Sequence, residues 1–191
     1  MMEPTRRTAD ARQNPELWTA LDEGRLLRAI LKDFYDEAFV DPVIGAFFAH
    51  TTKEWVIDHQ YAFLAQIWTG EKQYFGDRPR NAHHWMVISD EQFDHREAML
   101  VRCLRRHGLS DAHVDVWRTL DESFRSHIVK DRPFAKKRAG KALPLDGFEA
   151  LVLSAGGVCD GCQGEIAHGV TAHYHVRTGR TICADCLPDE R

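Results

Sequence analysis

Residues 27–48 read LRAILKDFYDEAFVDPVIGAFF and contain a clear helical pattern. Apolar side chains recur every three or four residues from Leu27 to Ala38, which is the period of an amphipathic helix. Tyr35 lies on this apolar stripe, so we expect its phenol to be buried. The helix should end before Pro42, because a residue that precedes proline is disfavoured in the helical conformation. A short apolar turn follows over residues 43–48.

A second apolar stripe contains one polar residue, Gln60, among Val56, Phe63, Leu64 and Ile67. Burying an amide or a phenol is costly unless the group finds a hydrogen-bond partner. Gln60 and Tyr35 could bond each other or a backbone carbonyl inside a plain helical core. Alternatively, both could donate into a cavity that holds a polar ligand, such as a diatomic gas at haem iron.

The bulk composition bounds the class of protein. A chain of 191 residues that is 43% hydrophobic can form one ordinary domain and a small appendage. The net charge of −4 argues against nucleic-acid binding, which favours a basic surplus. The polar segment 1–14 is expected to be disordered and is unlike a signal peptide, and no apolar run is long enough to span a membrane. We therefore expect a cytoplasmic protein.

Two adjacent histidines, His83 and His84, lie in an irregular stretch that begins at Pro79. A histidine in a loop is usually a surface residue. Neutral imidazole is also the standard protein ligand of haem iron in globins. The chemistry of the two side chains alone does not separate them.

Several motifs in a fixed order resemble the truncated (2/2) haemoglobins. Residues 34–48 contain FY, DP and FF as the opening of these proteins does, and residues 60–76 resemble the part that follows. His83, then Ile88 and Phe93 at intervals of five residues, completes the set. The match to the first group of the family has no gap from Tyr35 to His83. The resemblance covers roughly residues 16–130 and implies an all-α fold, the 2-over-2 globin.

The resemblance also implies roles for individual positions. It implies a b-type haem whose iron is bound by His83 rather than by His84. Tyr35 and Gln60 would donate hydrogen bonds to the gas on the distal side. Four apolar side chains would line the pocket: Phe48, Val56, Phe63 and Ile88.

Arg96 departs from the family pattern, because related globins place an apolar residue or a tryptophan at this position. We expect the Arg96 side chain to extend out of the pocket toward solvent. A shift in register and a direct role at the ligand site are the alternatives, in that order.

The C-terminal tail contains two CxxC pairs, Cys159 with Cys162 and Cys183 with Cys186, separated by 20 residues. This spacing is typical of a structural zinc site, in which each pair supplies two thiolates to one tetrahedral metal. Redox dithiols or an iron site are the alternatives. We expect a globin domain over residues 15–130, a basic linker over 131–157, and a small zinc-ribbon or knuckle module over 158–191 that Zn²⁺ stabilises.

Three hypotheses for function follow. The first is binding of O2, NO or CO at haem iron, with a structural zinc tail. Turnover as an NO dioxygenase or a peroxidase would need a separate reductase, because the chain has no flavin or nicotinamide fingerprint. The second is a haem-based gas or redox sensor whose zinc module contacts a partner. The third is a scaffold without haem that binds partners through the zinc knuckle.

Overall fold

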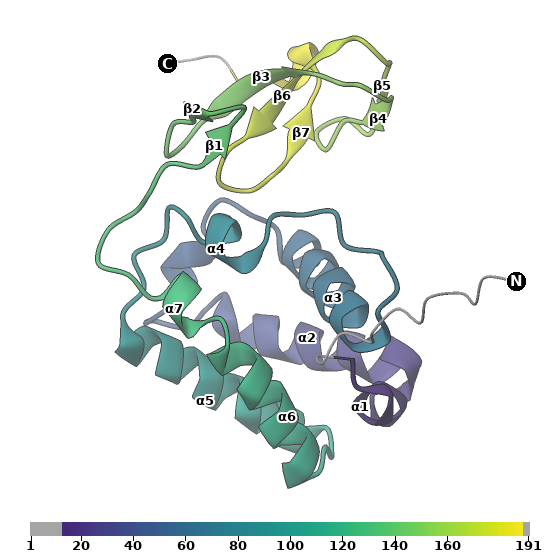
Figure 1. Cartoon of the computed structure of the whole chain (residues 1–191), viewed down its shortest axis with the longest axis vertical. Helices are drawn as coiled ribbons and strands as arrows, with labels where there is room; N and C mark the ends of the chain where they lie inside the picture. Colours follow the sequence, from purple (N-terminus) through teal and green to yellow (C-terminus); the bar gives the residue numbers. More distant parts are fainter. Residues whose placement is uncertain (1–12, 189–191) are drawn as a thin grey trace, which may run out of the picture. The chain divides into compact units, whose positions relative to one another are not determined.

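The computed structural model describes residues 13–188 and divides the chain into two compact units (Figure 1). The first unit comprises the chain up to Phe75 together with Asp90–Arg125. The second comprises Gly76–Ser89 together with the chain from Ser126 onward. The segment 1–14, which was expected to be disordered, lies outside the described residues except for Gln13 and Asn14. The loop Gly76–Ser89 therefore belongs to the same unit as the C-terminal region, although helices of the first unit flank it in sequence.

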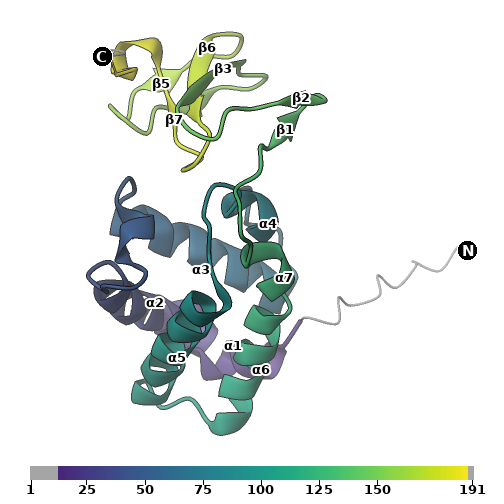
Figure 2. The same ribbon diagram turned by 90° about the vertical axis from the view of Figure 1, so that its left-hand side faces the viewer.

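The first unit is helical, as Figure 1 and Figure 2 show from two directions. Helix α2 packs against α3 and α5, and α5 packs against α6. The two apolar stripes predicted from the sequence, residues 27–38 and 56–67, lie in α2 and α3. The elements of this unit are α1 (Pro15–Ala20), η1 (Asp22–Gly24), α2 (Arg25–Ala38), η2 (Gly45–Phe48), α3 (Lys53–Thr69), α5 (Asp90–Arg106) and α6 (Asp111–Glu122).

Side-chain caps determine where three of these helices begin. Asn14, Thr52 and Ser110 each accept a hydrogen bond from a backbone N–H of the first turn, at 2.8, 3.3 and 3.3 Å. Helix α2 ends at Ala38, and the carboxylate of Asp41 then accepts hydrogen bonds from the next backbone N–H groups. The expected burial of the α2 stripe is confirmed for Leu27, Ile30, Leu31, Phe34, Tyr35 and Ala38.

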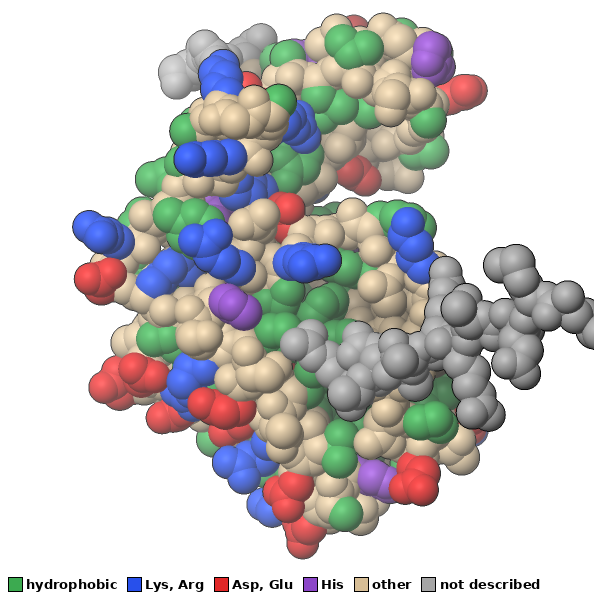
Figure 3. Space-filling view, in the orientation of Figure 1, with side chains coloured by type: hydrophobic (Ala, Val, Ile, Leu, Met, Phe, Trp, Pro, Cys, Tyr) green, Lys and Arg blue, Asp and Glu red, His purple; other side chains and the backbone are tan. Residues whose placement is uncertain are grey.

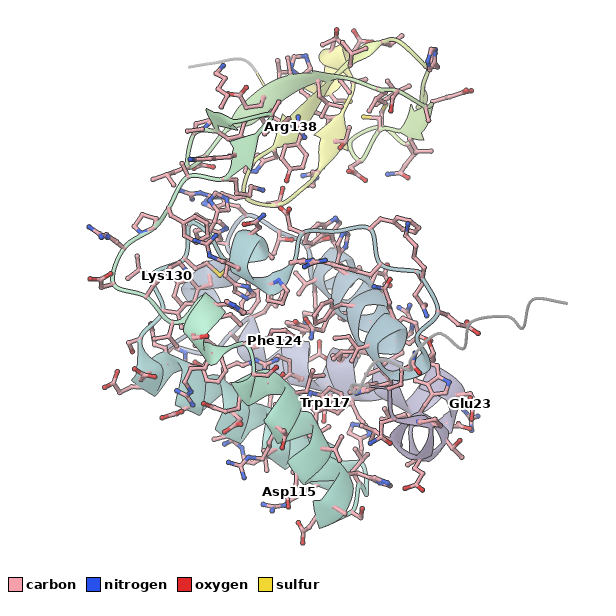
Figure 4. All side chains as sticks on the ribbon, in the orientation of Figure 1. Glu23, Asp115, Trp117, Phe124, Lys130 and Arg138 are labelled. Atoms are coloured by element: carbon pink, nitrogen blue, oxygen red, sulfur yellow. The ribbon has the colours of Figure 1, made fainter. Side chains whose placement is uncertain are left out.

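Two tryptophans form the centre of the contact between α3 and α6. Trp68 and Trp117 are almost completely buried, and their ring centroids lie 4.8 Å apart in an edge-to-face arrangement. Figure 4 shows Trp117 on the side of α6 that is turned toward the other helices, whereas Asp115 lies on the outer side and is exposed. The apolar face of α6 is thus well defined.

An ion pair joins α5 to α6. The guanidinium of Arg96 bonds the carboxylate of Asp121, whose side chain is only 9% exposed. The guanidinium also lies over the ring of Phe34, 5.2 Å from its centroid. The expectation that Arg96 extends to solvent is therefore wrong, because Asp121 supplies a charge partner inside the unit.

The second unit contains short strands as well as helical turns, so the expected all-α class holds only for the first unit. A three-stranded antiparallel sheet has the order β3-β6-β7, with Ala150 opposite His173 and His173 opposite Ile182. Strands β1, β2 and β3 lie in the range where the sequence suggested a linker. The elements are α4 (Pro79–Ala82), α7 (Arg125–Ile128, which starts at the unit boundary), β1 (Lys137–Arg138), β2 (Lys141–Ala142), β3 (Phe148–Val152), β4 (Gly157–Val158), β5 (Glu165–Ile166), β6 (Thr171–His175), β7 (Thr181–Ile182) and η3 (Ala184–Cys186).

Basic side chains cover the hairpin formed by β1 and β2. Lys137, Arg138 and Lys141 are exposed, and Figure 3 shows blue side chains gathered over this part of the second unit. The basic run that the sequence suggested as a linker is thus exposed at the hairpin, whereas Lys136, just before it, is buried. Across residues 13–188, no helix has the length and apolar character that crossing a membrane would require.

The Arg96–Asp121 pair generates a stability prediction. Asp121→Asn leaves the Arg96 charge without its partner in a poorly solvated position, so we expect the free energy of unfolding to fall by about 3 kcal/mol. Urea unfolding followed by circular dichroism measures this loss. The matched control is Asp115→Asn on the exposed side of α6, which should change stability by no more than about 0.5 kcal/mol. Equal losses in the two variants would contradict the assignment.

Candidate functional site

Tyr35 lies in a cluster of aromatic rings at the end of α2. It is 6% exposed, and its ring makes edge-to-face contacts with Phe34 at 4.9 Å and with Phe48 at 5.8 Å between centroids. Phe48 in turn stacks on Phe39 at 4.7 Å. The structure thus brings together two of the residues expected at the pocket, Tyr35 and Phe48. Phe39, which the sequence analysis missed, lies four residues after Tyr35 and so on the same helical face.

The hydroxyl of Tyr35 has a buried position but no protein partner. Within residues 13–188, no hydrogen bond to this hydroxyl is found. Burial raises the pKa of Tyr35 to about 12, and the nearby Arg96 guanidinium opposes this shift only in part. The phenol is therefore protonated at neutral pH. Its O–H group can donate a hydrogen bond to a polar group outside this unit.

Helix α3 has a second apolar face besides the one in the core. The fully packed face consists of Ile57, Leu64, Ala65 and Trp68. The residues expected at the pocket are Val56, Gln60 and Phe63; they follow helical spacing on one face, and all three are only half-buried. The stripe inferred from the sequence thus mixed two faces of one helix.

Gln60 shares the feature that marks Tyr35. In the described part of the chain, its amide makes no hydrogen bond. The two side chains therefore do not bond each other or a nearby carbonyl, which was one of the two alternatives left by the sequence. Phe63, the third residue of this face, contacts the rings of Tyr74 and Phe124, at 5.2 and 5.7 Å between centroids. Figure 4 marks Phe124 beyond the end of α6.

His83 caps the C-terminus of α4, a single helical turn that begins with Pro79 at its first position. The Nδ1 of His83 lies 2.8 Å from the carbonyl oxygen of Pro79. Because a carbonyl only accepts, Nδ1 carries the proton and the ring lone pair is on Nε2. A hydrogen bond from one ring nitrogen to a backbone carbonyl is the usual way in which a metal-ligating histidine is oriented.

His84 differs from His83 in its burial and in the contacts of its ring nitrogens. It is fully buried, and its two ring nitrogens face two carbonyl oxygens, Phe134 at 3.1 Å and Val176 at 3.0 Å. Burial lowers the pKa of His84, so the ring is neutral at neutral pH and donates to one of these carbonyls. A ring enclosed in this way is a structural element of the second unit.

Ile88, the last residue expected at the pocket, lies in the same unit as His83. Its side chain is 9% exposed, and its carbonyl accepts a hydrogen bond from the backbone N–H of Lys130 at 3.0 Å. This bond ties the end of the His83 loop to the segment after α7. Figure 4 labels Lys130 in that segment.

The four cysteines of the tail converge on one point. The sulfurs of Cys159, Cys162, Cys183 and Cys186 all lie within 4.8 Å of one another. The Sγ atoms of Cys162 and Cys183 are 3.9 Å apart, close to the roughly 3.8 Å between sulfurs that each lie about 2.3 Å from a tetrahedral zinc. Backbone N–H groups of Cys162 and Cys183 lower the pKa of the Cys159 thiol to about 6, whereas the sulfurs of Cys183, Cys162 and Cys159 raise the pKa of Cys186 to about 12, so all four could be thiolates only beside a bound cation.

Gly161 shows that the turn between the first two cysteines is closely packed. A Cβ atom at this position would lie 3.0 Å from the Cys186 sulfur and 3.5 Å from the Cys159 sulfur. The Gly161 N–H and the Cys183 N–H both donate to the Cys159 sulfur at 3.3 Å. The donor set and its backbone hydrogen bonds therefore fit one metal ion bound by four thiolates.

Asp121 was not identified from the sequence, although a signal for it exists. It lies four residues after Trp117 and one after Leu120, so it falls on the buried face of α6. An acidic residue on an apolar face of one helix and a basic residue on that of another predict an ion pair. The positions of Arg96 and Asp121 on such faces could therefore have predicted their ion pair from the sequence.

Comparison with known proteins agrees with the fold of the first part of the chain. The ferric truncated haemoglobin of the ciliate Tetrahymena pyriformis is 23% identical, with a TM-score of 0.55 over 59% of this chain and 97% of that one. The 2/2 haemoglobin of a Synechococcus species, solved in the cyanomet state, is 24% identical, with a TM-score of 0.54 over 59% and 94%. No curated protein matches the chain.

The family comparison covers more than half of the chain. The model of the bacterial-like globins matches residues 17–130, which include the aromatic cluster around Tyr35, the half-buried face of α3 and the His83 loop. The expected resemblance to truncated haemoglobins is confirmed by this match together with the structural likeness. The chain belongs to the bacterial-like, truncated (2/2) globin family.

Proposed function

We propose that the chain binds haem b with His83 as the protein ligand of the iron, and that Tyr35 and Gln60 donate hydrogen bonds to a diatomic gas. The observation that carries this proposal is the state of these two polar groups. Each lies on an apolar helix face of a globin, and neither has a hydrogen-bond partner in the described residues. Such groups are stabilised when a polar ligand completes their hydrogen bonds.

The residues of the chain fit a haem group. Globins bind haem, and haem iron supplies the coordination position at which a diatomic gas binds. Val56 and Phe63 form a half-buried apolar face beside Gln60, and Phe48 offers a second apolar surface beside Tyr35. These side chains would exclude water from the bound gas. The Tyr35 hydroxyl, protonated at neutral pH, would hold a proton toward it.

The geometry of the two adjacent histidines supports His83 as the iron ligand. The bond from Nδ1 to Pro79 sets the tautomer with the lone pair on Nε2. His84 has carbonyl oxygens against both ring nitrogens, so its use as a ligand would require breaking the contacts of a fully buried ring. The chemistry of the two side chains alone did not separate them; the half-buried position of His83, against the complete burial of His84, favours His83.

We also propose that Zn²⁺ occupies the four-cysteine cluster as a structural ion. Four sulfurs leave no open coordination position, so the site is built to stabilise rather than to catalyse. Among the described residues, the buried core around it is small: Cys159, Ile166, Ala172 and Ile182, with partly buried side chains such as Phe148 and Leu187 packed against them. A core of this size needs a metal or a cross-link to hold a fixed structure.

The experiment that tests haem binding is the absorption spectrum of the purified protein with haem supplied. We expect a Soret band for the parent protein. His83→Ala should lose haem or change the ferrous spectrum, because the iron loses its protein ligand. The comparison variant is His84→Gln, which keeps a side-chain donor and should retain the ligand-bound spectrum even if the protein is less stable. A parent protein without a Soret band, or an iron-ligand change only in the His84 variant, would overturn the proposal.

Tyr35→Phe tests the distal donor. The substitution removes a single hydroxyl and preserves the aromatic contacts, so the fold should be unaffected. We expect the gas to dissociate about 10- to 100-fold faster when it is O2, because a hydrogen bond to a partly charged acceptor contributes about 1–3 kcal/mol. Stopped-flow measurement of O2 dissociation gives this rate, with CO, a weaker acceptor, as the comparison ligand. An unchanged O2 rate would exclude Tyr35 from the site.

Metal analysis tests the four-cysteine site. We expect one zinc per chain and, in the native protein, four thiols that react with a thiol reagent only after a chelator is added. Cys103 is an internal control, because it is fully buried and burial raises its pKa to about 11, so it should react only after unfolding. Four thiols that react at once in the native protein would contradict a bound metal.

A further inference from the structure

A three-residue network attaches the loop that carries His83 to the strands of the C-terminal region. Lys136 is almost fully buried, and its ammonium donates to the carboxylate of Asp77 at 2.8 Å and to the hydroxyl of Tyr174 at 2.7 Å. The Tyr174 hydroxyl donates to the same Asp77 carboxylate at 3.3 Å. A buried ammonium requires such partners, so Asp77 at one end of the loop is held to β6.

The residue next to His83 provides a second attachment. The His84 ring is held between the carbonyls of Phe134 and Val176, and the His84 carbonyl accepts from the N–H of Phe134 at 3.0 Å. Arg80 adds a cation–π contact, with its guanidinium 4.3 Å from the centroid of the Phe134 ring. Both ends of the short segment that positions His83 are thus bonded to residues beyond α7.

The same strands connect these attachments to the four cysteines. Ala172 of β6 packs in the core that contains Cys159, while Tyr174 and Val176, further along, contact the loop. Strand β7 pairs with β6 and leads directly into Cys183. Asp160, inside the first CxxC turn, accepts from the N–H of Thr181 at 2.7 Å, and its own N–H donates to the Thr181 carbonyl. Two strands therefore separate the metal site from the His83 loop.

We propose that Lys136, Tyr174 and His84 are positioning residues for the iron ligand His83, and that a metal in the four-cysteine site fixes them in place. This inference rests on the proposed roles of His83 and of the cysteines. The free energy of metal binding stabilises the small core around Cys159, and the strands of that core hold the loop. Loss of the metal would therefore loosen the strands and, through them, the loop that carries His83. In this way the tail would influence how His83 is held without itself supplying an iron ligand.

Tyr174→Phe is the variant that tests the network without touching a metal ligand. It removes the hydroxyl that links β6 to both Lys136 and Asp77, leaves the direct Lys136–Asp77 contact in place, and keeps the ring over which Lys136 and Arg138 lie. Thr171→Val is the matched control, because it removes a hydroxyl from the exposed, opposite end of the same strand. Both variants are made in the full chain, alongside the parent protein with its metal and after removal of the metal by a chelator.

The first measurement is hydrogen exchange of the backbone amides of residues 77–88, with residues 111–122 of α6 as the internal reference. Exchange in the loop should be about tenfold faster in Tyr174→Phe and in the metal-free protein, and unchanged in Thr171→Val. The reference amides of α6 should not change. If exchange also accelerates in α6 of the metal-free protein, the chain has unfolded globally. The Tyr174→Phe variant, whose cysteines are intact, then decides whether the network holds the loop. Loop exchange that is unchanged in Tyr174→Phe overturns the inference.

The second measurement is the iron–histidine stretching band of the ferrous protein, because a merely structural role of Tyr174 would not move it. We expect the band to shift or broaden in Tyr174→Phe and to match the parent protein in Thr171→Val. The two measurements separate the two proposals. A protein that never binds haem overturns the proposed function, while its loop exchange still tests the connection to the metal. A normal band with normal loop exchange in Tyr174→Phe overturns the positioning role and leaves haem binding in place.

Discussion

Burying a polar group is costly unless it finds a hydrogen-bond partner, and this constraint accounts for several key contacts within residues 13–188, although the hydroxyl of Thr51 and the indole N–H of Trp117 are buried without one. Arg96 meets this constraint through Asp121, His84 through one of the two backbone carbonyls that face its ring, and Lys136 through Asp77 and Tyr174. Tyr35 and Gln60 do not meet it with any described residue. The contrast separates polar groups that hold the fold together from Tyr35 and Gln60, for which we propose a bound ligand as the partner. A polar residue on an apolar stripe is therefore informative only after its partners are known.

The sequence predicted the helices of the first unit because their signals are local. Periodic apolar residues, such as those from Leu27 to Ala38, and the proline at position 42 lie within one or two turns of the elements they define. The two apolar faces of α3 were merged, since Val56 and Ile57 are adjacent in sequence but lie on different faces, one toward the core and one half-buried. Strands β1 and β2 were missed because they are two residues long and exposed, so they carry no alternation.

The sequence predicts the candidate site only in part, because some of its contacts join residues that are far apart in the chain. The family resemblance named His83 by its spacing, but the physical difference between His83 and His84 depends on partners 50 and 92 residues away in the chain. No local pattern contains that information. The four cysteines are the opposite case: their spacing alone encodes the geometry, because a CxxC turn brings two sulfurs to one point wherever it occurs.

The bond between His84 and Val176 also has a consequence for how the protein is made. Its two residues are separated by 92 positions, so a ribosome synthesises most of the remaining chain before the bond can form. Contacts of such large sequence separation form late in folding, because a long loop must first be closed. The helices around Tyr35 can therefore assemble while the peptide is still being extended, whereas the segment with His83 acquires its final conformation only afterwards. Incorporation of haem would then be ordered by the direction of translation.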